Sequence, residues 1–235
     1  SILLLRKKPA PFPFQICRAG APPANLPVTA SDVLALQFPG HDEKSGLNNA
    51  SDPPQQEVTI ECNPSTLSHQ KAAALLALGV NRLSIGAQSF DPPVLKTLGR
   101  AHPVAAIHQC VATAREAGFA NINLDLIFGV PGQSLDSWRN ILREAIALQP
   151  QHLSCYALTH EEDTAFFLRH QRGELRDTPD LEAEMFRLAD EILTGAGYHL
   201  YEISNYALPG FECRDNLAYW RGEDYHGIGP CAGST

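Results

Sequence analysis

The stretch INLDLIFGVPGQ, residues 122–133, decides the fold class of this chain. Its apolar side chains Ile122, Leu124, Leu126 and Phe128 recur at every second position, which predicts a β-strand with one buried face. The sequence GVPG at 129–132 then ends the strand in a turn. Asp125 lies on the face opposite the apolar row. A carboxylate within an apolar strand is costly unless it is paired or hydrogen-bonded, so Asp125 either caps the following turn or faces a ligand cavity.

Composition and charge place the chain among ordinary globular proteins. It has 235 residues, 44% of them hydrophobic and 19% charged, and a net charge of −8 that argues against non-specific binding to nucleic acids or acidic membranes. No apolar run is long enough to span a bilayer. The basic residues of SILLLRKK follow its apolar run, an order that is wrong for a secretory signal. We therefore expect a cytoplasmic or organellar protein (mitochondrion or plastid), not a secreted one.

The cysteines support the same compartment and exclude a simple metal motif. The six cysteines stand at positions 17, 62, 110, 155, 213 and 231, without any CxxC pair. Such wide spacing favours isolated, reduced thiols over a disulfide framework. From the spacing alone we predict no metal site.

Three regions differ in their pattern. Residues 1–56 are rich in proline at the start and in polar breakers from 41 to 56, which predicts an unrelated or poorly ordered segment with one short helix at 31–38. Residues 57–197 alternate between strands and helices, and residues 198–235 form an extension that opens with an extended segment. The predicted strands are 58–62, 81–88, 122–128 and 152–158, and the main predicted helices are 70–78, 103–117, the one opened by 134–136, and 179–195.

Each predicted strand between 57 and 158 carries one apolar and one polar row. The polar rows contain Glu57, Thr59, Glu61, Arg82, Ser84, Gln88, Asn123, Asp125, His152, Ser154 and Tyr156. A doubly wound sheet needs two apolar faces, and a closed eight-stranded barrel fills its interior with bulky branched side chains. The polar rows therefore favour an α/β fold with a partial, open barrel whose lumen holds a polar ligand. The alternative is that these polar residues merely stand at strand ends.

Several short motifs, in this order and spacing, resemble the radical S-adenosylmethionine (SAM) superfamily. Within it they resemble the oxygen-independent coproporphyrinogen III oxidase group and its branch of HemW-like haem chaperones. The motifs are ECNP at 61–64, GVNRLSIGAQSF at 79–90, LGRAH at 98–102, NLDLIFGVPGQS at 123–134, HLSCYALT at 152–159, YEISNYA at 201–207, CRDNLAYW at 213–220 and GIGP at 227–230. The resemblance implies a partial (β/α)6 TIM-like radical SAM barrel, of which residues 57–197 supply the third to the sixth βα units.

The resemblance also implies a SAM site, residue by residue. Glu61 matches the position that holds the amino group of the methionine moiety, and Gln88 and Arg100 match positions that reach its polar and carboxylate groups. Asp125 matches the acid that binds the ribose hydroxyls, while Ile127 and Thr159 match positions around the adenine. Arg100 and Thr159 rest on the resemblance alone; by itself Arg100 has the pattern of a solvated charge at a helix end.

The chain also departs from the family pattern. The CxxxCxxC motif that holds a [4Fe–4S] cluster and the GGGTP stretch that approaches SAM are absent from the sequence. Asp215 stands where the family has His, and Cys231 and Gly233 stand where it has Gly and His. We therefore expect an incomplete copy of a HemW-like protein that binds SAM, lacks a cluster by itself, and belongs to haem delivery or porphyrin metabolism. Its expected partners are haem or porphyrin and a haem-accepting protein.

Two alternatives stay open at this point. One is an oxygen-independent coproporphyrinogen III oxidase, which decarboxylates propionates by radical chemistry, so enzymatic activity is left undecided. The other is a cluster-free, non-catalytic barrel that binds haem or a partner protein. Five histidines are candidate iron ligands, and the sequence does not choose among them: His102, His108, His152, His160 and His226.

Overall fold

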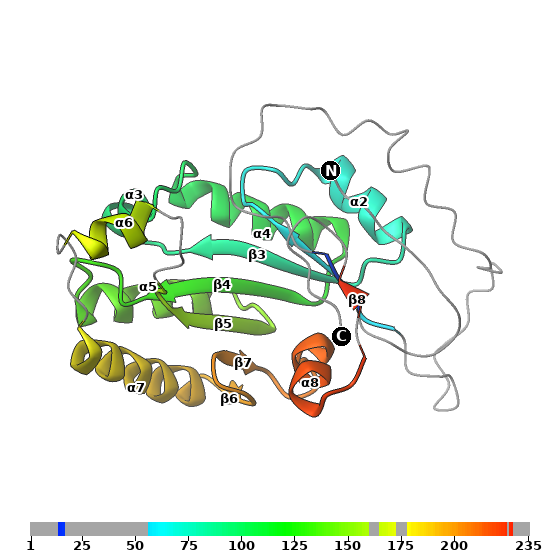
Figure 1. Cartoon of the computed structure of the whole chain (residues 1–235). Helices are drawn as coiled ribbons and strands as arrows, with labels where there is room; N and C mark the ends of the chain where they lie inside the picture. Colours follow the sequence, from blue (N-terminus) through cyan, green and yellow to red (C-terminus); the bar gives the residue numbers. More distant parts are fainter. Residues whose placement is uncertain (1–13, 17–55, 160–164, 173–177, 225, 228–235) are drawn as a thin grey trace.

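The computed structural model of the chain describes residues 14–16, 56–159, 165–172, 178–224 and 226–227 (Figure 1). The predicted helix at 31–38 lies outside these residues, as do Cys17, His160, Cys231 and Gly233. The proposed domain limits stay predictions.

The described strands form one sheet, and helices connect its central members. The strands are β1 Phe14–Ile16, β2 Val58–Cys62, β3 Arg82–Gln88, β4 Ile122–Phe128, β5 His152–Ala157, β6 His199–Leu200, β7 Asn205–Ala207 and β8 His226–Gly227. The helices are α2 His69–Ala77, α3 Pro92–Thr97, α4 Val104–Ala117, α5 Leu135–Ala147, α6 Ala165–Gln171, α7 Pro179–Gly195 and α8 Arg214–Arg221.

The strand order within the described residues is β6-β7-β5-β4-β3-β2-β1-β8, which is an open sheet. Strands β1 to β5 are parallel to one another, and short βα connections link β2 to β5 in that orientation. The prediction of a parallel sheet covered by helices is confirmed for β2 to β5. The extended segment predicted at 198–206 is instead a short hairpin, because β7 pairs antiparallel with both β5 and β6. Helices α6 and α8 were not predicted.

Local sequence signals set the ends of the main helices. The Ser68 side chain accepts a hydrogen bond from the Lys71 backbone N–H (3.3 Å) at the start of α2. The Ser134 side chain does the same for Ser137 (3.1 Å) at the start of α5. Helix α4 ends at Gly118, which has a φ of 109°. Glycine adopts this left-handed conformation at little cost because it has no Cβ.

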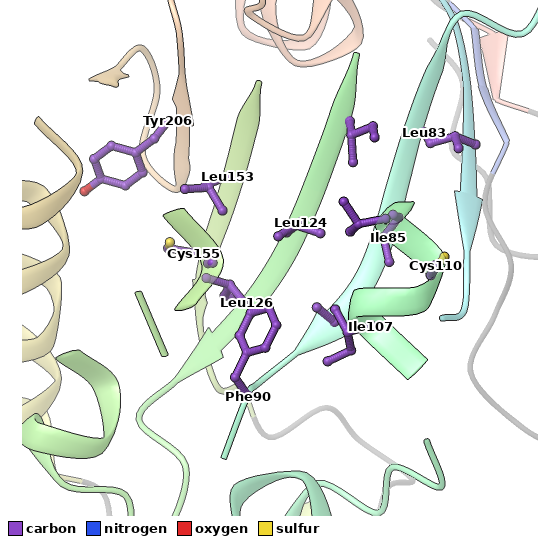
Figure 2. Close-up of a cluster of buried hydrophobic side chains, with 14 of the residues drawn as sticks. Leu83, Ile85, Phe90, Ile107, Cys110, Leu124, Leu126, Leu153, Cys155 and Tyr206 are labelled. Carbon is purple, nitrogen blue, oxygen red and sulfur yellow. The ribbon is translucent and has the colours of Figure 1, made fainter. Parts of the chain in front are cut away.

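One face of the sheet carries the hydrophobic core, and all of the long helices pack on it. Figure 2 shows Leu83, Ile85, Leu124, Leu126 and Leu153 on adjacent strands, with Ile107 and Cys110 approaching from α4. Residues of α2, α5 and α7 complete the same cluster. The alternation predicted for β4 is confirmed, because its four apolar side chains are 0–3% exposed.

The opposite face is left without a long helix, and it carries the polar rows. Among the described elements, the short helix α8 and Tyr201 reach this face close to the amino end of β5, where Tyr201 bonds both His152 and Asn216 of α8 (Figure 1). The carboxyl ends of the strands point the other way, toward α3. The polar face therefore has one end near α8, at the amino ends of the strands, and another near α3, at their carboxyl ends.

Candidate ligand-binding face of the sheet

The polar face is built from side chains that alternate away from the core on four parallel strands. Strand register places Glu61 beside Ser84, Ser84 beside Asn123, and Asp125 beside Ser154. Most of these side chains are buried, although the face has no apolar layer over it. Buried polar groups need hydrogen-bond partners, so the pattern of their bonds reveals how the face is organised.

Asn123 is the centre of this network. Its Nδ2 donates to Ser84 Oγ (2.7 Å) and to Asp125 Oδ1 (2.8 Å). Its Oδ1 accepts from Ser154 Oγ (3.2 Å) and from His152 Nδ1 (2.6 Å). The amide thus uses its full donor and acceptor capacity and joins β3, β4 and β5.

Asp125 is oriented by this network and is not a turn cap. Its second oxygen accepts from Ser84 Oγ (3.0 Å), so its two hydrogen bonds run along β4 and across to β3. Burial raises the pKa of the Asp125 carboxyl, while the bonds from Asn123 and Ser84 and the charge of Arg82 oppose that shift. The side chain keeps partial exposure, and each oxygen retains a lone pair for a further donor.

His152 extends the network to α8 through Tyr201. Burial, followed by the nearby charge of Arg82, lowers the pKa of His152 well below its usual value, so the ring is neutral. Its Nδ1–H donates to Asn123, and its Nε2 accepts from the Tyr201 hydroxyl (2.7 Å). That hydroxyl in turn accepts from Asn216 Nδ2 (3.0 Å) and from the Cys213 backbone N–H (3.2 Å).

Two of the other candidate iron ligands, His102 and His108, also lie within the described residues. His108 contacts the Glu144 carboxylate at 2.9 Å, and the Nε2 of His102 lies 3.2 Å from the Ala87 carbonyl oxygen. Both ring nitrogens of His152 are engaged. The side chains of His160 and His226 lie outside the described residues. None of the three described rings stands free on the polar face as an obvious haem ligand.

The remaining residues of the implied SAM site gather around the carboxyl ends of β2 to β5. Glu61 is partly buried near the end of β2, and Ile127 is partly buried on β4 in register with Tyr156. Gln88 ends β3 with a φ of 65°, a left-handed conformation that is strained for a non-glycine residue. Thr159 is exposed two residues beyond β5, so it is the outermost member of the set.

Arg100 follows α3 and faces a cavity of about 520 Å³ between α3 and the start of α4. Its buried Nε has no hydrogen-bond partner among the described residues. Burial lowers the pKa of Arg100, and the negative charge of Asp125 raises it, which shows that the two groups act on each other. The solvated helix-end charge that the sequence alone suggested is therefore wrong, because the guanidinium is partly buried.

A second cluster lies at the amino ends of the strands, and the sequence analysis did not find it. Glu57 precedes β2, Arg82 opens β3, and Cys213 and Asp215 come from the start of α8. Glu57 Oε1 accepts from Cys213 Sγ (3.5 Å) and from the Arg214 backbone N–H (3.1 Å). Only the fold brings these residues together, since Cys213 and Glu57 are 156 positions apart.

Burial sets the ionisation of this second cluster. Burial, and next the charge of Glu57, raises the pKa of Asp215 to about 7. Burial also raises the pKa of the Cys213 thiol to about 12. Burial lowers the pKa of Arg82, but the neighbouring side chains of Cys213 and Glu57 outweigh it and raise the pKa above its usual value.

The described thiols do not form an iron–sulfur site. The neighbouring Cys110 thiol, together with burial, raises the pKa of the Cys62 thiol well above its usual value. Cys155 is buried in the core, and Cys213 lies at the other end of the polar face. Among described residues, the only group of three candidate metal ligands within reach of one ion contains a single thiol.

Comparisons with known proteins identify the family. The Radical SAM superfamily model matches residues 32–145. Over 211 residues the chain is 38% identical to heme chaperone HemW of Synechocystis sp., covering 89% of this chain and 49% of that protein. Over 181 residues it is 40% identical to the mouse protein "Radical S-adenosyl methionine domain-containing protein 1, mitochondrial", covering 77% of this chain and 41% of that protein.

A solved structure supports the same assignment. Coproporphyrinogen III oxidase (HemN) from Escherichia coli, described as a radical SAM enzyme, superposes with a TM-score of 0.62 at 26% identity. The alignment covers 76% of this chain and 44% of that one. Fold and sequence therefore define a radical SAM protein. Within that superfamily the chain belongs to the HemW-like group.

The predicted family and fold class are thereby confirmed. The chain spans about half the length of the curated relatives it matches, between 41% and 49%. The family match begins at residue 32, within the segment that the sequence analysis set apart. In the described part of the chain, no helix combines the length and the apolar character that a membrane crossing needs.

Proposed function

We propose that this chain is the SAM-holding part of a HemW-like haem chaperone. The observation that carries the proposal is the Asp125 carboxylate, which Ser84 and Asn123 orient on the polar face. It is partly exposed and retains acceptor capacity, as a group that binds the two hydroxyls of a ribose must. A carboxylate that accepts from a ribose diol is the arrangement used in dinucleotide sites.

The surrounding residues fit the remaining groups of SAM. Glu61 would hold the amino group, and Arg100 would hold the carboxylate, because a guanidinium binds a carboxylate through two parallel hydrogen bonds. The buried Nε of Arg100, which has no partner among described residues, is consistent with a ligand at that position. Gln88 would contact the polar end of the methionine moiety, and Ile127 and Thr159 would flank the adenine.

SAM supplies a reductively cleavable carbon–sulfur bond when it is bound at a [4Fe–4S] cluster. The described thiols Cys62, Cys110, Cys155 and Cys213 do not fit such a cluster. The contribution of this chain is to bind and orient the adenosyl and methionine groups. Because the hydrogen-bond network already holds Asp125 in place, SAM binding does not have to lose the conformational entropy of ordering that side chain.

Haem or porphyrin is the proposed cargo, and a haem-accepting protein is the proposed partner. This part of the proposal rests on the relatives named heme chaperone HemW. The mouse relative named as mitochondrial supports an organellar compartment beside the cytoplasmic one. A second candidate function, oxygen-independent coproporphyrinogen III oxidation, is favoured by the superposition on the E. coli oxidase. A haem-binding barrel that works without SAM is the third.

Three titrations of the purified chain separate these candidates. Haemin is added while the Soret absorbance is followed, and SAM and coproporphyrinogen III are each titrated separately by calorimetry. The haem chaperone proposal predicts saturable binding of both ligands, with SAM binding weakened and haem binding kept in Asp125→Ala. Haem binding without SAM binding would support the third candidate. Binding of coproporphyrinogen III in place of haem would support the oxidase.

A further inference from the structure

We propose a divalent metal site of the zinc type at the amino ends of the strands, formed by Glu57, Cys213 and Asp215. One candidate ligand atom from each of these residues lies within 4.8 Å of the other two. The site is at the opposite end of the polar face from the SAM residues. It is therefore independent of the proposed function.

The spacing of the thiol and the first carboxylate suits zinc. Zinc binds cysteine sulfur at about 2.3 Å and carboxylate oxygen at about 2.0 Å in tetrahedral geometry. Two such ligands at the tetrahedral angle are about 3.5 Å apart. Cys213 Sγ and Glu57 Oε1 are 3.5 Å apart in the structure. Thiolate with carboxylate is a ligand set that zinc accepts and that magnesium or calcium does not prefer.

Asp215 supplies the independent evidence for a ligand. Its side chain is 3% exposed, and neither carboxylate oxygen has a hydrogen-bond partner among the described residues. Buried carboxylates are normally hydrogen-bonded, paired or bound to a metal, because an unpaired one loses its hydration without compensation. Arg82 is also 3% exposed, and among the ion pairs of the described residues none joins it to Asp215. A cation bound between the three ligands would compensate the lost hydration of the Asp215 carboxylate.

The charges around the site balance with a divalent ion. When ionised, the two carboxylates and the thiolate carry three negative charges. Arg82, buried at the start of β3 in register with Thr59, offsets one of them. A divalent cation offsets the other two.

The surroundings hold the ligands and leave a way in. The Arg214 backbone N–H donates to Glu57, and the Tyr201 hydroxyl accepts from the Cys213 backbone N–H. Such outer contacts fix the direction of metal ligands. Asp215 also lines a cavity of about 250 Å³ together with Asn216 and Tyr219, which gives an ion an entry path and leaves room for a water as fourth ligand.

Zinc and cobalt binding to the purified 235-residue chain test the site. After removal of metals with a chelator, Zn²⁺ is titrated by calorimetry, and Co²⁺ is titrated while the thiolate-to-cobalt charge-transfer absorbance is followed. We expect about one ion per chain, a charge-transfer band, and a higher melting temperature with Zn²⁺. Cys213→Ser should abolish the band, and Asp215→Asn should weaken Zn²⁺ binding at least tenfold.

Matched variants keep the result interpretable. Both substitutions preserve side-chain size, and circular dichroism of the metal-free variants reports whether they fold. Cys155→Ala removes another buried thiol and should leave the cobalt band unchanged. Absence of a tight Zn²⁺ site in the folded wild type overturns the proposal. So does a cobalt band that survives in Cys213→Ser, or Zn²⁺ affinity that is unchanged in folded Asp215→Asn.

Discussion

Tyr201→Phe should destabilise the fold more than removal of a single hydroxyl normally does. The Tyr201 hydroxyl donates to His152 Nε2 (2.7 Å) and accepts from Asn216 Nδ2 (3.0 Å) and the Cys213 backbone N–H (3.2 Å). It therefore joins β5 to the beginning of α8. Phenylalanine fills the same space but satisfies none of the three groups.

The magnitude follows from those three bonds. An ordinary intramolecular hydrogen bond contributes about 1 kcal/mol net, and a buried polar group left without a partner costs about 1–3 kcal/mol. His152 is fully buried, and within the described residues Tyr201 is the one partner of its Nε2, so loss of that bond leaves a buried nitrogen unsatisfied. Asn216 is only partly buried and recovers part of its loss by binding water. We expect a loss of roughly 2–5 kcal/mol in the free energy of unfolding.

Urea denaturation, followed by far-ultraviolet circular dichroism, measures this loss. Tyr198→Phe is the matched control, because the Tyr198 hydroxyl is also buried but makes a single hydrogen bond within the described residues, to the Pro150 carbonyl oxygen (2.6 Å). The control should lose about 1 kcal/mol. If Tyr201→Phe costs no more than Tyr198→Phe, the network between β5 and α8 does not stabilise the fold as described.

Three further predictions concern the acid sensitivity of the fold, the packing of its core and the absence of a [4Fe–4S] cluster. The fold keeps His152 neutral and lowers its pKa well below the unfolded value, so the stability that this gives is present above about pH 6.5 and is lost as the pH falls. Between pH 6.5 and 5 the free energy of unfolding of the wild type should drop by up to about 1.4 kcal/mol per pH unit, and that of His152→Gln should drop less steeply. Equal slopes of the two proteins in urea titrations would contradict this prediction. Leu124→Ala, in the middle of the core and 0% exposed, should cost about 2–5 kcal/mol in the same assay, and a loss below 1 kcal/mol would mean that this face is not tightly packed. The chain reconstituted with iron and sulfide should hold no stoichiometric [4Fe–4S] cluster, because no three of the described thiols lie close enough to bind one cluster. An absorption spectrum typical of a cubane cluster, with about four irons per chain, would contradict this prediction.

Alternation along single strands was enough to predict the two faces of the sheet. Leu124 and Asp125 lie on opposite faces because successive side chains of a strand always do, whatever the tertiary context. Ser134 marked the start of α5 correctly because a side-chain cap is a local interaction. Family motifs added the positions of Arg100 and Thr159, which no periodicity predicts.

Contacts between distant segments could not be predicted in this way. The sequence analysis noted that Asp215 replaces a histidine, but it gave no hint that Glu57 lies beside Cys213. It listed His152 as a candidate iron ligand, whereas the structure engages both its ring nitrogens. In each case the partner comes from another element, and side-chain chemistry depends on that partner as much as on the residue itself.

Calorimetric titration of SAM into the wild-type chain and into Asp125→Ala tests the central claim most directly. Loss of a hydrogen bond to a charged group costs about 1.5–3 kcal/mol, so Asp125→Ala should bind SAM roughly tenfold to hundredfold more weakly. Tyr198→Phe, which removes a hydroxyl bonded to the Pro150 carbonyl oxygen just before the amino end of β5, should bind SAM like wild type. Equal SAM affinity of wild type and Asp125→Ala, or no SAM binding by the folded wild-type chain, would contradict the assignment of the polar face as the SAM site.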